Sequence, residues 1–248
     1  MKLKVFKDLE GLSRQAARFF KDLSQKAITE KGVFTVALSG GSSPARLYEL
    51  LAADEFRPQI DWRGVHLFWA DERCAPFMHA EGNFRLVFDL LISRVALPSE
   101  NIHRIMGEKG AEQGSALYEE TLRGFFKGDG LPAFDLAILG MGRDGHTASL
   151  MPASPALNER QRRVVPVYMQ GEGSFDRITL TLPVLNNAKE VLFIVSDPEK
   201  KDALRDILHG RGAGRHPAGL VAGRPCGVTW FVDERTYDAV RPADSKAR

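Results

Sequence analysis

The stretch FDLAILGMGRDGHTASLMP, residues 134–152, joins a short apolar segment to a glycine-rich loop. Residues 134–139 have the length and composition of a buried strand, and we expect them to form one. The next seven positions, 140–146, hold three glycines, an aspartate and a histidine. Glycine lets the backbone turn sharply beside a ligand, and histidine titrates near neutral pH. Since open α/β sheets bind ligands at the carboxyl ends of their strands, we expect the chemistry between Arg143 and Ser149.

Similar apolar runs recur on both sides of this stretch and alternate with amphipathic segments. We expect further strands at residues 33–38, 65–69, 164–167, 177–182, 191–195 and 227–232. Helices are expected at residues 8–29, 45–53, 83–95, 111–127, 183–188 and 198–208. Such alternation predicts a mostly parallel sheet with helices on both faces, an α/β fold of three layers. We find no repeat or linker, so residues 1–248 are predicted to form a single domain with a polar tail from about residue 241.

Composition narrows the possible partners. The 34 basic and 32 acidic residues leave a formal charge of +2, which gives no reason to expect nucleic acid or membrane binding. Cys74 and Cys226 lie far apart and outside any CxxC spacing, so we expect neither a disulfide framework nor a zinc site. No apolar run approaches the roughly 18 residues of a membrane span, and residues 1–8 lack the apolar core of a signal peptide. A cytoplasmic protein is the expectation.

A second glycine-rich loop, SGGSSP at residues 39–44, follows the strand expected at 33–38. Ser43 is a suitable N-cap and Pro44 suits the first position of a helix. Unpaired N–H groups and the positive end of the helix dipole would then point into one small space, as in sites that bind phosphate or carboxylate. A capped turn without a ligand fits the same pattern. The loop lacks the GK[ST] ending of a P-loop.

Charged residues follow the strand expected at 65–69. Asp71–Arg73 form either a solvated loop or a site, and their position after so apolar a strand favours a site. Asn83 is either the N-cap of the next helix or a ligand contact. Lys200 lies near the start of a helix, where a cation opposes the dipole. A nearby anion would offset this unfavourable interaction with the dipole. Simple solvation of the lysine side chain would also explain its position.

The spacing of Gly140, Gly142 and Gly145 also matches the GxGxxG dinucleotide fingerprint. That fingerprint requires the third glycine to lie in a helix of several turns. Pro152 and Pro155 follow within ten residues, and no acidic residue stands at a strand end about 20 residues further on. The pattern therefore argues against a nicotinamide enzyme.

His146 stands in a polar loop with Asp144 two residues earlier. A carboxylate beside an imidazole fixes its tautomer and raises its basicity, which prepares it to act as a general base. The sequence has no GxSxG nucleophile motif and no HExxH zinc motif. If the protein is a hydrolase, direct attack by water with His146 as base is the simplest scheme.

Taken together, several motifs resemble one family, the 6-phosphogluconolactonases of the pentose phosphate pathway. The matching segments, in family order, are residues 39–44, 71–73 with Asn83, 140–152, 177–183, 199–204 and 228–230. The resemblance implies a modified Rossmann-like fold, similar to that of glucosamine-6-phosphate deaminases and ribose-5-phosphate isomerases. It also implies hydrolysis of 6-phospho-D-glucono-1,5-lactone to 6-phosphogluconate, the second step of the oxidative pathway, without metal or cofactor.

The sequence departs from the family pattern at three places. Ser43 stands where threonine is common, Gly82 where serine is usual, and Met151 where phenylalanine is frequent. Met151 also separates the chain from the deaminases, whose loop typically continues AFNEP with a glutamate that partners the histidine. A thioether cannot perform that acid–base role, so the lactonase interpretation is favoured over a deaminase or isomerase.

The resemblance also implies roles for individual residues. His146 would be the base, Asp144 would orient it, and Arg73 would serve either the oxyanion or the phosphate. The residues expected to bind the substrate and its phosphate are Gly40, Gly41, Ser42, Ser43, Asp71, Asn83, Arg177 and Lys200. A non-catalytic sugar-phosphate-binding protein remains an alternative. The only expected partner is the small-molecule substrate, with the chain a monomer or a weak homo-oligomer.

Overall fold

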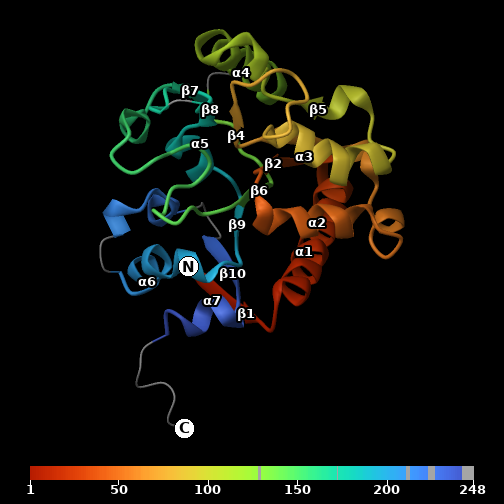
Figure 1. Ribbon diagram of the computed structural model, residues 1–248. Coiled ribbons are helices and arrows are strands. Elements are labelled where there is room, and N and C mark those ends of the chain that lie inside the picture. Colours follow the sequence, from red (N-terminus) through yellow and green to blue (C-terminus); the bar gives the residue numbers. More distant parts are fainter. Residues whose placement is uncertain (128–129, 172, 211–212, 223–226, 242–248) are drawn as a thin grey trace.

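A seven-stranded sheet forms the centre of the molecule (Figure 1). The computed structural model describes residues 1–127, 130–171, 173–210, 213–222 and 227–241. In spatial order the strands are β1 (Lys2–Phe6), β10 (Val228–Asp233), β9 (Glu190–Val195), β6 (Leu136–Leu139), β2 (Phe34–Leu38), β3 (Val65–Trp69) and β5 (Ile102–His103). All of its neighbouring strands pair in parallel. The mostly parallel sheet predicted from the sequence is therefore confirmed.

Helices cover both faces of this sheet. Figure 1 shows α1 (Leu9–Lys31) and α2 (Ser42–Ala52) on one side and α6 (Lys201–Leu208) on the other. The remaining helices are α3 (Asn83–Leu90), α4 (Ala111–Phe126), α5 (Leu182–Asn186) and α7 (Glu234–Asp238). Every residue of β2 and β6 is buried, because these strands lie mid-sheet with a layer on each face. The fold therefore belongs to the three-layer α/β/α class, as expected from the sequence.

The two central strands lie where the strand order reverses. After β2 the chain crosses to β3 on one side, whereas after β6 it crosses to β9 on the other. The two loops leaving these adjacent strands therefore diverge and leave a crevice at the carboxyl ends, where open α/β sheets bind their ligands. Both glycine-rich loops of the sequence emerge at this point.

A second, smaller sheet lies beside the first and contains β4 (Asp71–Arg73), β8 (Arg177–Leu180) and β7 (Val164–Val167), all antiparallel. Ala70 joins the two sheets. Its N–H donates to the Leu38 carbonyl of the large sheet at 2.8 Å, and its carbonyl accepts from the Leu180 N–H of the small sheet at 2.8 Å. The charged segment at residues 71–73 is thus a strand, and the solvated-loop alternative is wrong.

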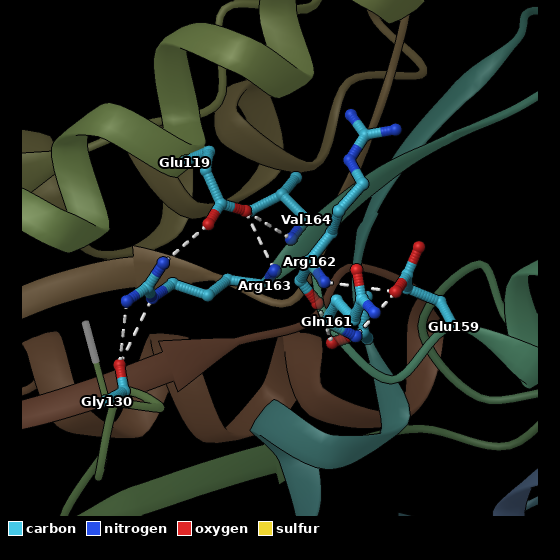
Figure 2. A network of polar contacts seen from close by, with 8 residues as sticks. Glu119, Gly130, Glu159, Gln161, Arg162, Arg163 and Val164 are labelled. Atoms are coloured by element: carbon cyan, nitrogen blue, oxygen red, sulfur yellow. Dashed lines mark hydrogen bonds and ion pairs between the residues drawn. The ribbon is translucent and has the colours of Figure 1, made fainter.

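Helix α4 is fixed to the edge of the small sheet by a carboxylate (Figure 2). Glu119 accepts hydrogen bonds from the N–H groups of Arg163 and Val164, at 2.8 and 2.9 Å, and pairs with the Arg163 guanidinium at 2.8 Å. That guanidinium also donates to the Gly130 carbonyl at 2.9 Å. Strand β7 contains Pro166 and lies at the edge of the small sheet, which suits a residue that cannot donate to a strand ladder.

Some boundaries differ from those expected. Strand β1 was not expected from the sequence, and α3 ends at Leu90, followed by a short 3-10 turn at Ile92–Arg94. Cys226 and the tail beyond residue 241 lie outside the described residues. Within the described ranges, none of the helices combines the length and apolarity needed to cross a membrane.

Candidate active site

A pocket of about 260 Å³ opens at the crevice between the loops that follow β2 and β6. Its lining residues are Ser39, Gly40, Gly41, Ser42, Ser43, Pro44, Asp71, Arg73, Asn83, Gly140, Met141, Gly142, Arg143, His146, Ala148, Arg177, Asp197 and Lys200. The structure thus brings together all the site residues expected from the sequence except Asp144, whose carboxylate contacts His146. The lining residues come from β4 and β8 of the small sheet, from the loops that follow β2, β6 and β9 of the large sheet, and from the starts of α2 and α3.

The loop after β2 forms one wall and is shaped by its glycines. A Cβ on Gly40 would lie 1.9 Å from the Asn83 Oδ1, so only glycine permits this close approach. Gly41 has a φ of +95°, a conformation that residues with a side chain rarely adopt. The Tyr48 hydroxyl donates to the Ser39 carbonyl at 2.6 Å and fixes the start of the loop. The N-terminus of α2 therefore faces the pocket with its backbone exposed.

Ser43 is not the N-cap of α2. The helix begins at Ser42 with Gly41 as its cap, and no side chain caps it. The Ser43 hydroxyl instead accepts a hydrogen bond from the Lys200 ammonium at 3.3 Å. Ser39 is buried as well, and its hydroxyl has no partner in the structure. Because buried polar groups are nearly always paired, this hydroxyl is placed to bond a ligand.

Two arginines lie opposite each other on neighbouring strands of the small sheet. Arg73 of β4 and Arg177 of β8 are directly paired in the antiparallel register, and both line the pocket. Like charges directly opposite on neighbouring strands are destabilising, and an anion between them removes that repulsion. Burial first, and then the charge of Arg73, lower the pKa of Arg177. Arg73 donates to the Glu81 carbonyl, while its buried Nε has no partner.

The carboxylate of Asp71 lies in the pocket wall and is held by its neighbours. It accepts from the Ser149 hydroxyl at 2.6 Å and from the Asn83 amide at 3.0 Å. The same amide donates to the Asp71 carbonyl at 2.9 Å. Asn83 is the first residue of α3, and Gly82 is the N-cap. The N-cap residue makes no side-chain hydrogen bond to α3. Instead, the Glu72 carboxylate accepts hydrogen bonds from the first two N–H groups of the helix, those of Asn83 and Phe84, at 2.7 and 2.6 Å.

The loop after β6 presents His146 to the pocket. The His146 Nδ1 lies 2.6 Å from the Asp144 carboxylate, which also accepts the His146 backbone N–H at 3.1 Å. Because a carboxylate accepts, Nδ1 carries the proton and Nε2 keeps a free lone pair. Burial alone would raise the pKa of Asp144, but these contacts with His146 lower it below its ordinary value. Asp144 thus stays ionised and holds the ring in the orientation of a base.

Hydrogen bonds within the loop fix this geometry. The Gly142 N–H donates to the His146 carbonyl at 2.9 Å, and the Thr147 hydroxyl donates to the Gly140 carbonyl at 2.9 Å. A Cβ on Gly142 would lie 2.2 Å from the His146 ring. Gly145 lies in a turn with a φ of +83° rather than inside a helix, which agrees with the argument against a dinucleotide fingerprint.

The sequence analysis assigned no role to two charged residues of the pocket: Arg143, which begins the segment where chemistry was expected, and Asp197. Arg143 forms an ion pair with Glu199 at the pocket mouth, where both side chains are exposed. Burial lowers the pKa of Lys200; the charge of Asp197 opposes this shift and that of Arg143 adds to it. Arg143 lies in the glycine-rich loop and Asp197 comes before an expected helix, but neither local pattern indicates that the two residues meet at one pocket. Only the fold brings them to the pocket.

The fold and the pocket define an α/β protein with a cation-lined pocket and an oriented histidine at the switch point of its sheet. The family model described as glucosamine-6-phosphate isomerases/6-phosphogluconolactonase matches residues 7–231. The chain therefore belongs to this family.

Individual relatives agree with this assignment. The chain is 39% identical to a probable 6-phosphogluconolactonase of Arabidopsis thaliana, over 94% of this chain and 93% of that protein. It is 37% identical to a 6-phosphogluconolactonase of Synechocystis sp., over 88% and 89% of the two chains. The crystal structure of 6-phosphogluconolactonase from Thermotoga maritima superposes with a TM-score of 0.80 at 30% identity, covering 94% of this chain and 99% of that one.

A monomeric glucosamine-6-phosphate deaminase also superposes, with a TM-score of 0.81 at 19% identity, over 96% and 100% of the two chains. At that identity the likeness shows a shared fold alone. It confirms the expectation that this chain and the deaminases have the same architecture.

Proposed function

We propose that this protein hydrolyses 6-phospho-D-glucono-1,5-lactone to 6-phosphogluconate, as its named relatives do. One observation supports this most directly: a histidine oriented by a carboxylate shares a pocket with four cationic side chains, those of Arg73, Arg143, Arg177 and Lys200. A substrate for such a pocket carries an anionic group at one end and a bond that water can attack at the other. A phosphorylated sugar lactone has both.

In the proposed mechanism, His146 acts first as base and then as acid. Its Nε2 removes a proton from water as the water oxygen bonds to the lactone carbonyl carbon. The resulting oxyanion collapses, the bond from that carbon to the ring oxygen breaks, and the imidazolium protonates the ring oxygen. Asp144 remains ionised throughout and stabilises the imidazolium. The product acid then ionises and releases a proton.

The phosphate is proposed to lie on the loop of Gly40–Ser43, against the N-terminus of α2. The first N–H groups of a helix have no partners within it, and its dipole favours an anion there. Lys200 reaches the same place through its contact with Ser43, and Arg177 lines the opposite wall. Arg73 lines the same pocket, and its unpartnered Nε supports a direct contact with substrate, at either the phosphate or the oxyanion. Asp71 and Asn83 would support the sugar hydroxyls.

The two alternative functions are less well supported. A deaminase would need an acid to partner the histidine, and Met151 stands in its place and does not line the pocket. A binding protein without activity would have no need of the pre-oriented pair of His146 and Asp144. Both alternatives lead to a different result in a simple assay.

The test uses freshly prepared 6-phosphogluconolactone and follows acid release at neutral pH. We expect consumption well above the uncatalysed rate, and no ammonia from glucosamine 6-phosphate. Ammonia release would instead support the deaminase. Binding of 6-phosphogluconate without any acceleration would identify a binding protein and overturn the proposal.

We also propose that residues 1–248 act as one domain, since one cluster of buried side chains contains residues of every strand from β2 to β10 except β4 and β5. A cytoplasmic location, and a monomeric or weakly associating state, stay predictions. Several relatives are described as chloroplastic. Light scattering would measure the oligomeric state, and a dimer stable at nanomolar concentration would contradict it.

A further inference from the structure

His216 contacts the loop that follows β6 at two points; this loop carries His146 and is called the catalytic loop below. Its Nδ1 is 2.8 Å from the Asp144 carbonyl, and a Cβ on Gly145 would lie 2.5 Å from the same nitrogen. The Ala218 N–H, two residues further on, donates to the Gly145 carbonyl at 2.9 Å. His216 does not line the pocket. It therefore contacts the backbone that carries the base without contacting a substrate.

The other ring nitrogen connects His216 to helix α6. Its Nε2 lies 3.2 Å from the Asp206 carboxylate, and the His216 side chain is only 15% exposed. Both partners, a carbonyl and a carboxylate, accept hydrogen bonds. Each ring nitrogen of His216 therefore faces an acceptor from a different segment. The ring lies between the loop of Asp144 and helix α6 and contacts both.

These contacts connect the two functional ends of the pocket. Helix α6 begins immediately after Lys200, the proposed phosphate ligand, and carries Asp206 one and a half turns later. The Asp144 residue whose carbonyl His216 holds also binds His146 through its carboxylate. One ring thus joins the helix of the phosphate ligand to the loop of the base.

We infer that His216 is a positioning residue that fixes the catalytic loop relative to α6, so that His146 faces the carbonyl of a substrate whose phosphate is held near Lys200. The inference rests on the proposed lactonase function. Because His216 acts through Asp144, its loss disturbs the orientation of the base and leaves the phosphate contacts in place. A small misplacement of a catalytic group costs up to about 100-fold in rate. The effect therefore belongs to kcat rather than to KM.

Two substitutions at this position separate the two contacts. His216→Asn keeps a donor at the level of Nδ1 and loses the reach to Asp206. His216→Gln keeps a donor at the level of Nε2 and loses the bond to the Asp144 carbonyl. His209→Asn is the matched control, because the His209 Nε2 also lies 3.2 Å from a backbone carbonyl, that of Val240, away from the pocket.

We expect His216→Gln to lower kcat about 10- to 100-fold with KM within about threefold of wild type. His216→Asn, which keeps the bond to the Asp144 carbonyl but loses the link to α6, should lower kcat about 3- to 10-fold, and His209→Asn should match wild type. Equal kcat for His216→Gln and His209→Asn would overturn the inference. So would a kcat for His216→Asn equal to that of His209→Asn, or a loss confined to KM. If His216→Gln does not fold, Asp206→Ala tests the same connection, with an expected loss of about 3- to 10-fold in kcat; an unchanged kcat would overturn the inference.

A second measurement is independent of activity. The Nδ1–H proton of His146, bonded to Asp144, should give a protected NMR signal in wild type and in His209→Asn. We expect this signal to broaden or disappear in His216→Gln and to persist in His216→Asn. If wild type shows no lactonase activity, the proposed function fails while this result still decides the positioning role. An unchanged signal in His216→Gln would contradict that role.

Discussion

The two loops at the switch point start from adjacent strands and use their polar groups in opposite ways. The loop after β2 leaves groups open: the buried Ser39 hydroxyl has no partner, and no side chain caps α2. The loop after β6 bonds to itself, through Gly142 to His146 and through Thr147 to Gly140. The first loop keeps donors free for a ligand, and the second keeps one catalytic group in place.

This difference matches two requirements of catalysis. Binding a phosphate needs donors that have no better partner in the empty protein. Accelerating a reaction needs groups that already lie in the geometry of the transition state, so that no reorganisation accompanies the chemical step. Substitutions in the first loop should therefore change affinity, and substitutions in the second should change turnover.

The largest effect is expected for His146→Ala. A general base contributes roughly 10²- to 10⁴-fold in rate, so kcat should fall by that factor while binding of 6-phosphogluconate stays close to wild type. Initial-rate measurements with the uncatalysed rate subtracted, together with calorimetry of product binding, check both parts. Turnover close to wild type would show that the loop after β6 does not carry the base.

Lys200→Ala tests the phosphate site proposed at the loop after β2, which Lys200 contacts through Ser43. A hydrogen bond to a charged group contributes about 1.5–3 kcal/mol, so KM should rise roughly 10- to 100-fold with kcat little changed. Lys201→Ala is the control, because Lys201 is the adjacent residue and is exposed. A defect in kcat alone would place Lys200 at the reacting carbonyl instead of the phosphate.

The affinity of the phosphate site should also depend on pH. Burial lowers the pKa of Lys200, and the charge of Arg143 adds to this effect. The ammonium therefore loses its proton at a lower pH than an ordinary lysine does. Affinity for 6-phosphogluconate should be full below that pKa and fall about 3- to 10-fold as the pH rises through it. Calorimetry across the alkaline range measures this, and Lys200→Met should remove the dependence; a dependence that persists would assign it to another group.

The smallest effect is expected for Glu199→Gln. Its ion pair with Arg143 joins the two regions across the pocket mouth, but both side chains are exposed. Exposed pairs typically contribute about 0–1 kcal/mol, so we expect KM to change by less than about threefold. KM should fall rather than rise, because Arg143 becomes free to attract the phosphate. A tenfold change in kcat would mean that this pair holds the catalytic loop.

The sequence predicted the central strands because their apolar runs are continuous. Strand β1 escaped prediction because four of its five residues are exposed and its partner, β10, lies at the other end of the chain. Strand β4 consists of three charged residues, and its extended form depends on pairing with β8. Neither partner can be inferred from local pattern.

The candidate site was predicted where function leaves a local motif, as in the loops around Gly40 and His146. The assignment of Ser43 as N-cap was wrong because its hydroxyl contacts Lys200, 157 positions away. Arg143 lay in the segment where chemistry was expected but had no predicted role, and no local pattern indicated that Asp197 lies in the pocket or that His216 contacts the loop after β6. Their places depend on how the loops cross, which only the folded chain determines.

Ala70 is hydrogen-bonded to both sheets, and this restricts how the two sheets can move relative to each other. A hinge between the two sheets would break the bonds from its N–H to Leu38 and from Leu180 to its carbonyl, both 2.8 Å long. These amides should therefore exchange their hydrogens with solvent only when the whole protein unfolds. We therefore expect the walls of the pocket, which come from the small sheet and from loops of the large sheet, to move as one body on the timescale of catalysis. Any opening that admits substrate has to come from side chains and loops at its mouth.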